Sequence, residues 1–448
     1  MNKREFLAVG GAVPLMLAGC GGSGSGSAPV RLVNASVGYP NLGFMVESTQ
    51  ATSSDVAYGA ASPFETVQAG SVGVTLTVSG ASATAAQTRT INKGTRYSLV
   101  AYGYANELKS VLIAESTTTP DTGKANVNVL NTSVDIGAVD VYLSTTTDLS
   151  VSTLIASSIS GVSQSAFSGV LAGSYYVTVV GANSISKGIS DVRFQSPAAI
   201  TLTALEILTI ILTPGASGVL ANTILLTQGT GSSTGTVSYL NTTARVRAVT
   251  AVPGMATSVA GTTAAGAAVT LLSSSTTQQY SNYFVVATGT PPVVTVNGAA
   301  VSVVMDSTSG EVAATLSAGG DYTLMVYLDS SSAAKAKLIT DNNTAPVTSS
   351  GVKFRLINLA SDNQGLQLSM SVNSISIASN IPYATASEYT EVSSVPQTTN
   401  STATVDNGPT TLVSHTQVMA LDNIFTDIVV SVPSSGSVLD FFRSASGT

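Results

Sequence analysis

The sequence predicts an all-β protein, built of tandem immunoglobulin-like antiparallel β-sandwiches that follow an N-terminal signal segment. Apolar and polar residues alternate through the chain, and an alternating strand with the same ending returns at domain-sized intervals. Residues that favour helices are scarce, and only 9% of the 448 residues are charged. A chain of this length exceeds one small core, so we expect several domains.

Period-two alternation is the main evidence for strands. Val or Leu occupies every second position of residues 72–78, and Tyr or Val does so in residues 175–179. Gly, Asn and Pro interrupt these runs, as they do at turns between strands. Short strands with frequent turns favour β-sandwiches.

The chain begins like a bacterial lipoprotein precursor. Lys3 and Arg4 precede an apolar stretch at residues 6–17, and Leu17-Ala18-Gly19-Cys20 follows. This ending resembles a lipobox, in which the cysteine receives a thioether-linked diacylglyceryl group and, after cleavage, an acyl chain such as palmitate on its amine. The resemblance implies a signal peptide at residues 1–19, lipidation of Cys20 and a Gly-Ser tether within residues 20–29. The alternative is a free cysteine in an ordinary signal.

The N-terminus also bears on export and location. Residues 3–7 resemble a weakened twin-arginine motif, although Lys-Arg pairs occur in general signals too. Gly21 stands where an aspartate would resemble an inner-membrane retention signal. We therefore expect a lipid-anchored protein of the bacterial cell envelope, on the outer membrane, with its periplasmic or surface-exposed orientation open.

Composition excludes several classes of function. The formal charge is 17 − 24 = −7 for the whole chain, and an acidic chain without a basic cluster is a poor partner for nucleic acid. A single cysteine leaves no disulfide within the chain. The longest apolar run after the signal, residues 200–212, is too short to span a bilayer and contains Glu206, so we expect no transmembrane helix.

Four strands with a shared ending predict four domains. Each of these strands ends in an asparagine that is followed by small residues. The four asparagines are Asn34, Asn131, Asn241 and Asn358. Asparagine bonds its own backbone and starts turns. The predicted β-sandwiches are residues 30–116, 124–228, 236–341 and 352–448, joined by linkers rich in Thr, Ser, Gly or Asn. We expect them to form a semi-extended rod.

Two of these segments resemble a known family. Residues 30–36, the segment from Tyr58 to Phe64, and residues 97–103 are similar to the bacterial extracytoplasmic repeat called domain of unknown function DUF4397. Residues 383–389 match the middle motif in the fourth domain, while residues 159–167 match it loosely and the third domain has no clear match. The resemblance implies small β-sandwiches on exported, often lipid-anchored proteins, and implies no activity.

Residues able to carry catalysis are few. His415 is the one histidine, and a Ser-His-Asp hydrolase would need it as the base. It lies in an alternating stretch, so we expect a solvent-facing strand residue. A zinc site needs three or four Cys or His ligands, which the chain does not have. No metal, cofactor or catalytic residue is therefore predicted.

Carboxylates and tyrosines leave two alternatives open. Asp135, Asp140 and Asp148, with Asp341-Asn342-Asn343 and Asp362-Asn363, offer oxygen ligands for a hard cation, but ordinary Asx turns explain them better. The tyrosines at positions 97, 102, 104, 280, 283, 322 and 327 could form a sugar-binding face, although such residues more often fill sandwich cores.

Two functional hypotheses follow. The first is a non-enzymatic, lipid-anchored protein of structural, adhesive or spacer type, whose partners are membrane lipid through acylated Cys20 and an envelope or host-surface polymer. The alternative is a binding protein for polysaccharide or another envelope polymer that uses exposed tyrosines. A third and weaker reading is a hydrolase that uses carboxylates alone.

Overall fold

The computed structural model of the chain describes residues 26–185, 191–229, 235–276, 279–307, 310–348, 351–360, 364–392, 400–407, 410–418, 425–432 and 437–443. In these ranges the regular elements are strands and one short 3-10 turn. The predicted all-β fold is confirmed. Within the same ranges, no helix is long and apolar enough to cross a membrane.

The first domain is a sandwich of two sheets. Its strands are β1 (Ser27–Ala35), β2 (Asn41–Val46), β3 (Thr49–Gln50), β4 (Val56–Ala57), β5 (Glu65–Gln68), β6 (Gly70–Val78), β7 (Ala81–Ser82), β8 (Gln87–Ile91), β9 (Tyr97–Tyr102) and β10 (Lys109–Ala114). One sheet has the order β10-β9-β1-β5, and the other β3-β2-β6-β7 with β4 and β8 added. Leu32, Phe44 and Leu99 fill the core between the sheets.

The second domain repeats this plan with longer sheets. Its elements are β11 (Lys124–Asn131), β12 (Val139–Ser144), the turn η1 (Leu149–Val151), β13 (Thr153–Ile159), β14 (Ser163–Gln164), β15 (Ser168–Leu171), β16 (Gly173–Gly181), β17 (Val192–Gln195), β18 (Ile200–Leu202), β19 (Ile207–Pro214), β20 (Ala221–Gln228) and β21 (Thr236–Tyr239). The sheet β14-β11-β19-β20-β21 faces the sheet β13-β12-β16-β17. Val129, Val179 and Ile210 lie in the core between them.

The third domain has its own pair of sheets. Its strands are β22 (Thr243–Ala251), β23 (Thr257–Thr262), β24 (Ala268–Ser275), β25 (Gln279–Tyr280), β26 (Phe284–Ala287), β27 (Val293–Val296), β28 (Ala299–Val301), β29 (Val303–Ser307), β30 (Gly310–Ala313), β31 (Asp321–Leu328) and β32 (Ala334–Asp341). The orders are β25-β22-β31-β32-β29-β30 and β24-β23-β27-β28. Val246, Val259 and Leu324 are buried between the sheets.

The fourth domain closes the described chain. Its strands are β33 (Val352–Asn358), β34 (Leu368–Val372), β35 (Ile375–Ile381), β36 (Thr385–Ala386), β37 (Thr390–Val392), β38 (Asn400–Asn407), β39 (Thr410–Val418), β40 (Phe425–Val432) and β41 (Ser437–Arg443). The orders are β36-β33-β40-β41 and β35-β34-β38-β39. Phe354, Leu356 and Met370 lie in its core.

Each domain contains a parallel pairing, and the third has a second one between β29 and β32, whereas the sequence predicted antiparallel sheets throughout. The opening strands β1, β11, β22 and β33 pair in parallel with β9, β19, β31 and β40. Two strands that lie far apart in the sequence therefore run side by side through the middle of one sheet. Apolar alternation does not distinguish the two directions, because it reports only which face is buried.

The strand predicted to open the third domain belongs instead to the second. β21 pairs antiparallel with β20, so that Thr236 lies opposite Leu226. Asn241, at the end of this stretch, donates from its side chain to the backbone oxygens of Ala221 and Arg193 in the second domain. The third domain opens with β22, and the boundary predicted at residue 236 is therefore too early.

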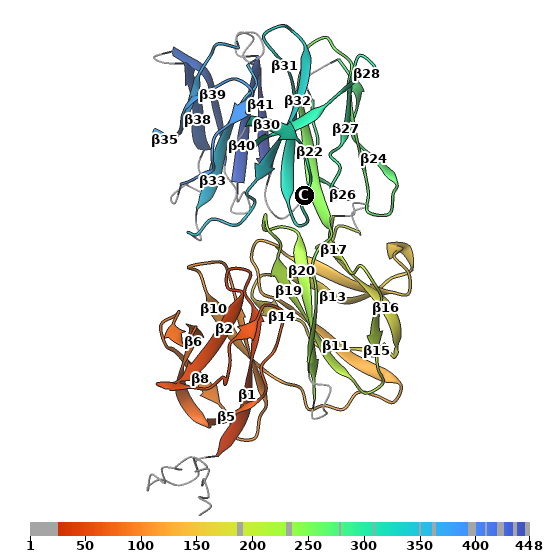
Figure 1. Cartoon of the computed structure of the whole chain (residues 1–448), viewed down its shortest axis with the longest axis vertical. Helices are drawn as coiled ribbons and strands as arrows, with labels where there is room; N and C mark the ends of the chain where they lie inside the picture. The colour runs from red at the N-terminus through yellow and green to blue at the C-terminus, as the bar shows by residue number, and fades with distance from the viewer. Residues whose placement is uncertain are drawn as a thin grey trace, which may run out of the picture.

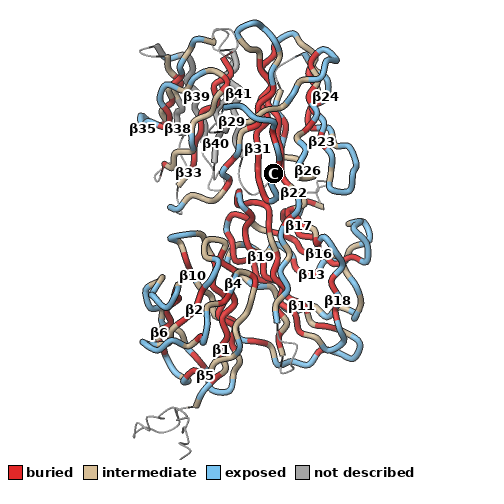
Figure 2. The backbone as a smooth tube through the Cα atoms, viewed as in Figure 1, coloured by how far each residue is buried: buried red, intermediate tan, exposed pale blue. Residues whose placement is uncertain are grey.

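The domains pack in pairs through the faces of their sheets, which corrects the expected semi-extended rod (Figure 1). A buried cluster joins the first and second domains: Val33, Ala35, Val100, Ile113, Leu130, Ile211, Ile224 and Leu226. A second cluster joins the third and fourth: Val249, Ala251, Met325, Tyr327, Ile357, Leu359 and Ala384. Figure 2 shows buried backbone through the middle of each pair, with exposed residues gathered at the outer turns.

Candidate functional site

The same serine contact recurs on the opening strand of every domain. Each serine accepts a hydrogen bond at Oγ from a strand N–H and donates to the carbonyl of its own next residue; the four are Ser62, Ser165, Ser281 and Ser387. An aromatic residue follows each of them by two positions. The middle motif is thus present in the third domain as Ser281-Asn282-Tyr283. The sequence comparison missed it because only the spacing Ser-x-aromatic is shared.

In three domains this aromatic ring covers basic side chains of the opening strand. The guanidinium of Arg31 lies 4.7 Å from the centre of the Phe64 ring. Arg247 lies 4.9 Å from the ring of Tyr283, and Arg355 lies 4.5 Å from the ring of Tyr389. A cation over an aromatic face is stabilised where water is excluded. The motif therefore holds arginines at the contacts between paired domains.

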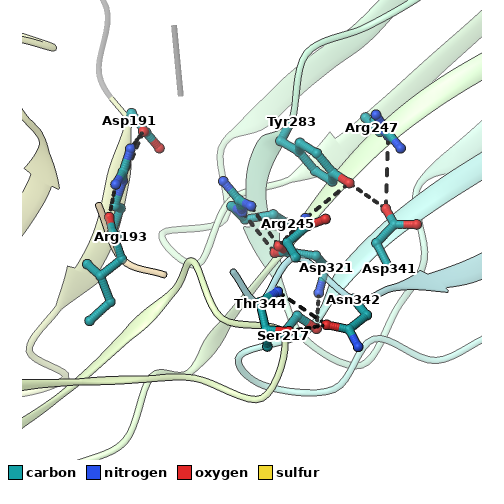
Figure 3. Close-up of polar contacts among 12 residues, drawn as sticks. Asp191, Arg193, Ser217, Arg245, Arg247, Tyr283, Asp321, Asp341, Asn342 and Thr344 are labelled. Carbon is teal, nitrogen blue, oxygen red and sulfur yellow. Dashed lines mark hydrogen bonds and ion pairs between the residues drawn. The ribbon is translucent and has the colours of Figure 1, made fainter. Parts of the chain in front are cut away.

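Asp341 is the centre of a buried polar network between the third and fourth domains. Arg355 of β33 donates from Nη2 to Oδ1 of Asp341 at 2.7 Å. The hydroxyls of Tyr283 and Thr323 donate to Oδ2 at 2.6 and 2.7 Å. The Nε of Arg247 lies 3.9 Å from the same oxygen (Figure 3). Since Asp341 ends β32 and Arg355 lies in the next domain, this network ties the two domains together.

Asp321 carries a second set of contacts, which reaches across to the first pair of domains. Arg245 donates to its two carboxylate oxygens from Nε and Nη2, at 2.8 and 2.6 Å, and Asn343 donates to Oδ2 at 2.6 Å. The backbone N–H of Asp321 donates to Oγ of Ser217 at 3.0 Å. Ser217 lies in the turn between β19 and β20 of the second domain. The two pairs of domains are thus joined at this turn (Figure 3).

A related buried ion pair lies within the first domain, at its contact with the second. Arg31 Nη2 lies 2.6 Å from Oε1 of Glu115, and both side chains are 1% exposed. The hydroxyl of Ser98 donates to the same oxygen at 2.7 Å. Arg31 also donates to the carbonyl of Thr227 in the second domain at 3.0 Å. Glu115 comes directly after β10, and Asp341 is the last residue of β32, so the two pairs of domains place a carboxylate at the end of corresponding strands.

Burial and charge together fix the ionisation of these groups. Burial alone would raise the pKa of Asp341, but its two arginine neighbours hold that pKa below its ordinary value. Burial lowers the pKa of Arg245, and the Asp321 carboxylate more than offsets this, so that the pKa is raised. Burial lowers the pKa of Lys353 to about 8. The Asp341 carboxylate therefore stays ionised while donors occupy both of its oxygens, an arrangement that suits docking of domains better than proton transfer.

A cleft of about 820 Å³, hereafter the interdomain cleft, lies where the first two domains meet the segment that follows β32. Asp135 lies in its wall and accepts hydrogen bonds from the Tyr104 hydroxyl at 2.7 Å, from Oγ of Ser133 at 3.0 Å and from the N–H of Ala345 at 2.5 Å. These contacts hold the cleft in shape, because they link all three of its walls.

Aliphatic side chains surround the interdomain cleft. Val134, Val162 and Val347 line it and are 57%, 44% and 77% exposed. Glu107 and Lys109 add charges of both signs to the lining. A concave site with apolar surface and a few polar groups is the usual form of a ligand site. Tyr104, Asp135 and Asp341 were candidates from the sequence, but their meeting in one cleft could not be predicted, since its walls come from three separate segments.

Backbone N–H groups occupy two of the acidic residues considered for a cation. Asp140 accepts hydrogen bonds from the N–H groups of Ser158 and Asn183 at 2.8 and 2.9 Å. Asp148 accepts one from the N–H of Ser150 at 2.8 Å, at the start of η1. The Asp148 contact is an Asx turn of the kind that the sequence favoured, whereas the Asp140 contacts are made between distant segments. Among the described residues, no three His, Cys, Asp or Glu side chains gather as a metal site.

Most of the seven tyrosines contribute to packing. Those at positions 97, 102, 322 and 327 are between 4% and 8% exposed, whereas Tyr280 is 52% exposed. Tyr327 meets Tyr383 edge to face, with ring centres 5.9 Å apart. The described tyrosines of this set therefore favour the core over an open sugar-binding face.

Other predicted residues are placed only in part. The backbone of His415 lies in β39 opposite Ala403, and its side chain is outside the described structure. Cys20 and residues 362–363 also lie outside the described residues. The predictions for these positions stay predictions.

Residues 28–142 match the family model Domain of unknown function (DUF4397). The matched range covers the first domain and reaches β12 of the second, which agrees with the resemblance seen in the motifs around Tyr58 and Tyr97. No curated protein matches the chain at a significant level. The similarity of the fourth domain to this family stays a prediction.

Proposed function

We propose that this chain is a non-catalytic protein of the bacterial cell envelope, held on the outer membrane by acylated Cys20. Its four β-sandwiches serve a structural, adhesive or spacer role. The observation that carries this proposal is the use of its scarce charged residues. The chain has 17 basic and 24 acidic residues, and several are buried at contacts between domains: Arg31, Glu115, Arg245, Arg247, Asp321, Asp341 and Arg355.

Buried ion pairs of this kind support a fixed shape more than they support chemistry. Removing one partner leaves an uncompensated buried charge, so alternative arrangements of the domains are disfavoured. When the domains are held rigidly in pairs, the exposed surface keeps a fixed shape and a limited range of distances from the anchor. That property suits a spacer or an adhesin.

Fractionation of cells tests the anchor. The wild-type chain should stay with the outer membrane through a carbonate wash, and Cys20→Ala should move to the soluble fraction or accumulate as precursor. Equal membrane retention of both would overturn the anchor.

The non-catalytic part of the proposal predicts that His415→Ala changes no measurable property of the purified chain. A hydrolytic activity that disappears in this variant would overturn that part.

The interdomain cleft favours a second candidate, the binding of an envelope polysaccharide or another polymer. Its aliphatic lining and the hydroxyls beside Asp135 offer both apolar and polar contacts to a single glycan chain. A panel of envelope glycans tests this, with Val162→Asp in the cleft compared with Val293→Asp. Val293 is 62% exposed and lies in β27 of the third domain. Binding that Val162→Asp abolishes and Val293→Asp retains supports the cleft, and equal binding by both variants contradicts it.

A further inference from the structure

The described chain starts at one end of the first pair of domains, and several turns of both domains lie at that same end. Gly26 begins the described chain, and the N–H of Gly94 donates to the carbonyl of Ser27. In the second domain, the N–H of Leu205 donates to the carbonyl of Lys124, which starts β11. The turns at residues 92–95, 121–124, 171–173 and 203–206 form what we term the anchor-proximal end.

Register places these turns at one end of the molecule. Glu115 donates its N–H to the carbonyl of Arg96, at the start of β9, and Ser116 donates its N–H to Oε1 of Gln228 in the second domain. Gln228 lies opposite Ile207, at the start of β19. β1, β9, β11 and β19 therefore begin at the same end, at which the described chain also starts (Figure 1).

Two leucines stand exposed at this end. Leu171 is 65% exposed and pairs with Lys124, while Leu205 is 53% exposed on the other side of the same strand. Leu205 also has a φ of 67°, a conformation that is unfavourable for leucine. Strands of one sheet are about 4.8 Å apart, so the two side chains flank β11 within roughly 10 Å of each other.

The charges beside these leucines are of both signs. The Lys124 side chain is 39% exposed and lies 2.9 Å from the Asp121 carboxylate, which is 77% exposed. The Lys93 side chain lies over Gly26. A face of mixed charge avoids the repulsion that a net charge of −7 would cause if the acidic body met an anionic surface.

The length of chain to the anchor limits what can lie against this end. Five residues lie between Cys20 and Gly26, which makes six Cα–Cα steps, and a fully extended chain spans at most about 3.5 Å per step. The reach is therefore about 20 Å. Leu205 lines one pocket together with Arg96 and Glu115, so the turn at residues 203–206 lies beside the start of β9 in the first domain.

We propose that the anchor-proximal end rests on the bilayer that carries acylated Cys20, with Leu171 and Leu205 inserted at the level of the headgroups and upper acyl chains. This inference rests on the proposed anchor. The lipid holds the body at high local concentration, and the two leucines then select one orientation, with the third and fourth domains pointing away from the membrane.

The chain contains no tryptophan, so a single introduced tryptophan reports its own surroundings. The test uses Leu171→Trp and Leu205→Trp in the mature chain, with Val293→Trp as the exposed control in the third domain. The Cys20 thiol is coupled to a maleimide lipid in phosphatidylcholine vesicles. This coupling makes the test independent of acylation in cells, which the fractionation of Cys20→Ala measures separately.

We expect the emission of Trp at positions 171 and 205 to shift to shorter wavelength on vesicles and to be quenched by brominated lipid. The Val293→Trp emission should not change. Equal, unquenched spectra at all three positions would overturn the proposal. A shift at positions 171 and 205 that appears without vesicles and grows with protein concentration would also overturn it, because the face would then bind a second copy of the chain.

Discussion

At the scale of single residues, the buried carboxylates do the most to join the domains. The Asp341 side chain is buried and accepts hydrogen bonds from donors of two domains, so its removal affects more than one contact. A sequence with few charges makes each such residue easy to notice. Its partners cannot be inferred, because Arg355 and Tyr283 approach from strands far away in the chain.

Asp341→Asn should destabilise the protein by about 3–5 kcal/mol at neutral pH, because two buried guanidiniums lose their counter-charge. Chemical denaturation of the full chain measures this. Asp121→Asn is the matched control, since its side chain is 77% exposed and pairs with one surface lysine. The control should change the unfolding free energy by about 0.5 kcal/mol or less. Similar losses in both variants would contradict the central role of Asp341.

The lowered pKa of Lys353 predicts how the free energy of unfolding changes with pH. Its side chain donates to the carbonyls of Asn342 and Thr344 at 3.0 Å, and burial lowers its pKa to about 8. An unfolded lysine keeps its proton to a pKa near 10.4. Between about pH 8 and pH 10.4 the unfolded state therefore binds more protons, and stability rises with pH through this site.

The comparison of wild type with Lys353→Met isolates this effect. The unfolding free energy of the wild type relative to the variant should increase from pH 8 to pH 10, because the other titrating groups are common to both. Urea unfolding at several pH values measures the difference. A difference that is flat, or that falls over this range, would show that Lys353 titrates normally in the folded protein.

At the scale of elements, the turn between β19 and β20 decides how the two pairs of domains meet. Its Ser217 N–H donates to the carbonyl of Gly319 at 3.2 Å, and the N–H of Asn343 donates to the carbonyl of Ser217 at 3.1 Å. Gly218 has a φ of +99°, and a Cβ there would lie 2.9 Å from the backbone oxygen of Asn343. Glycine at this position is required by both the backbone and the neighbour.

Gly218→Ala should therefore loosen the junction as well as strain the turn. Gly254→Ala is the matched control, because Gly254 has a φ of +76° and an added Cβ would meet no atom within 4 Å. The control should cost about 1 kcal/mol from the backbone alone. The Gly218 variant should cost more and should raise the radius of gyration in solution scattering. Equal behaviour of the two variants would show that the junction does not depend on this close approach.

The strand endings show what the sequence could predict. Asn34, Asn131 and Asn358 each donate from Nδ2 to two backbone carbonyls and accept an N–H two residues later, as the strand-ending role requires. Local chemistry made these three predictable. The fourth, Asn241, makes a similar turn but ends a strand of the second domain.

The reason for the error is physical. The third domain has Thr250 at the position of these asparagines, two residues after Ala248, whose N–H is bonded by Ser281. The Oγ1 of Thr250 accepts an N–H from Gln279 across the sheet, a contact made between distant strands. Such long-range contacts leave no local pattern, which is also why the interdomain cleft and the pairing of the domains could not be predicted.

At the scale of the whole molecule, the pair of domains is the natural unit of stability. Val33, Val100 and Ile113 of the first domain are 0% to 5% exposed because Leu130 and Ile211 of the second domain cover them. A single domain would present this apolar face to water, together with Arg31 and Glu115. Contiguous apolar surface of this kind promotes association.

A polypeptide of residues 26–241 should therefore unfold cooperatively as a monomer, whereas residues 26–116 alone should aggregate or melt at a lower temperature. The longer fragment includes β21 because this strand completes the sheet of the second domain. Calorimetry and sedimentation of the two fragments measure the difference. Replacing Val100 by Thr in the short fragment should improve its solubility, since it removes apolar surface that the second domain would otherwise cover. If residues 26–116 form a monomer that is as stable as the pair, the buried cluster between the domains adds no stability. The four sandwiches would then fold as independent domains.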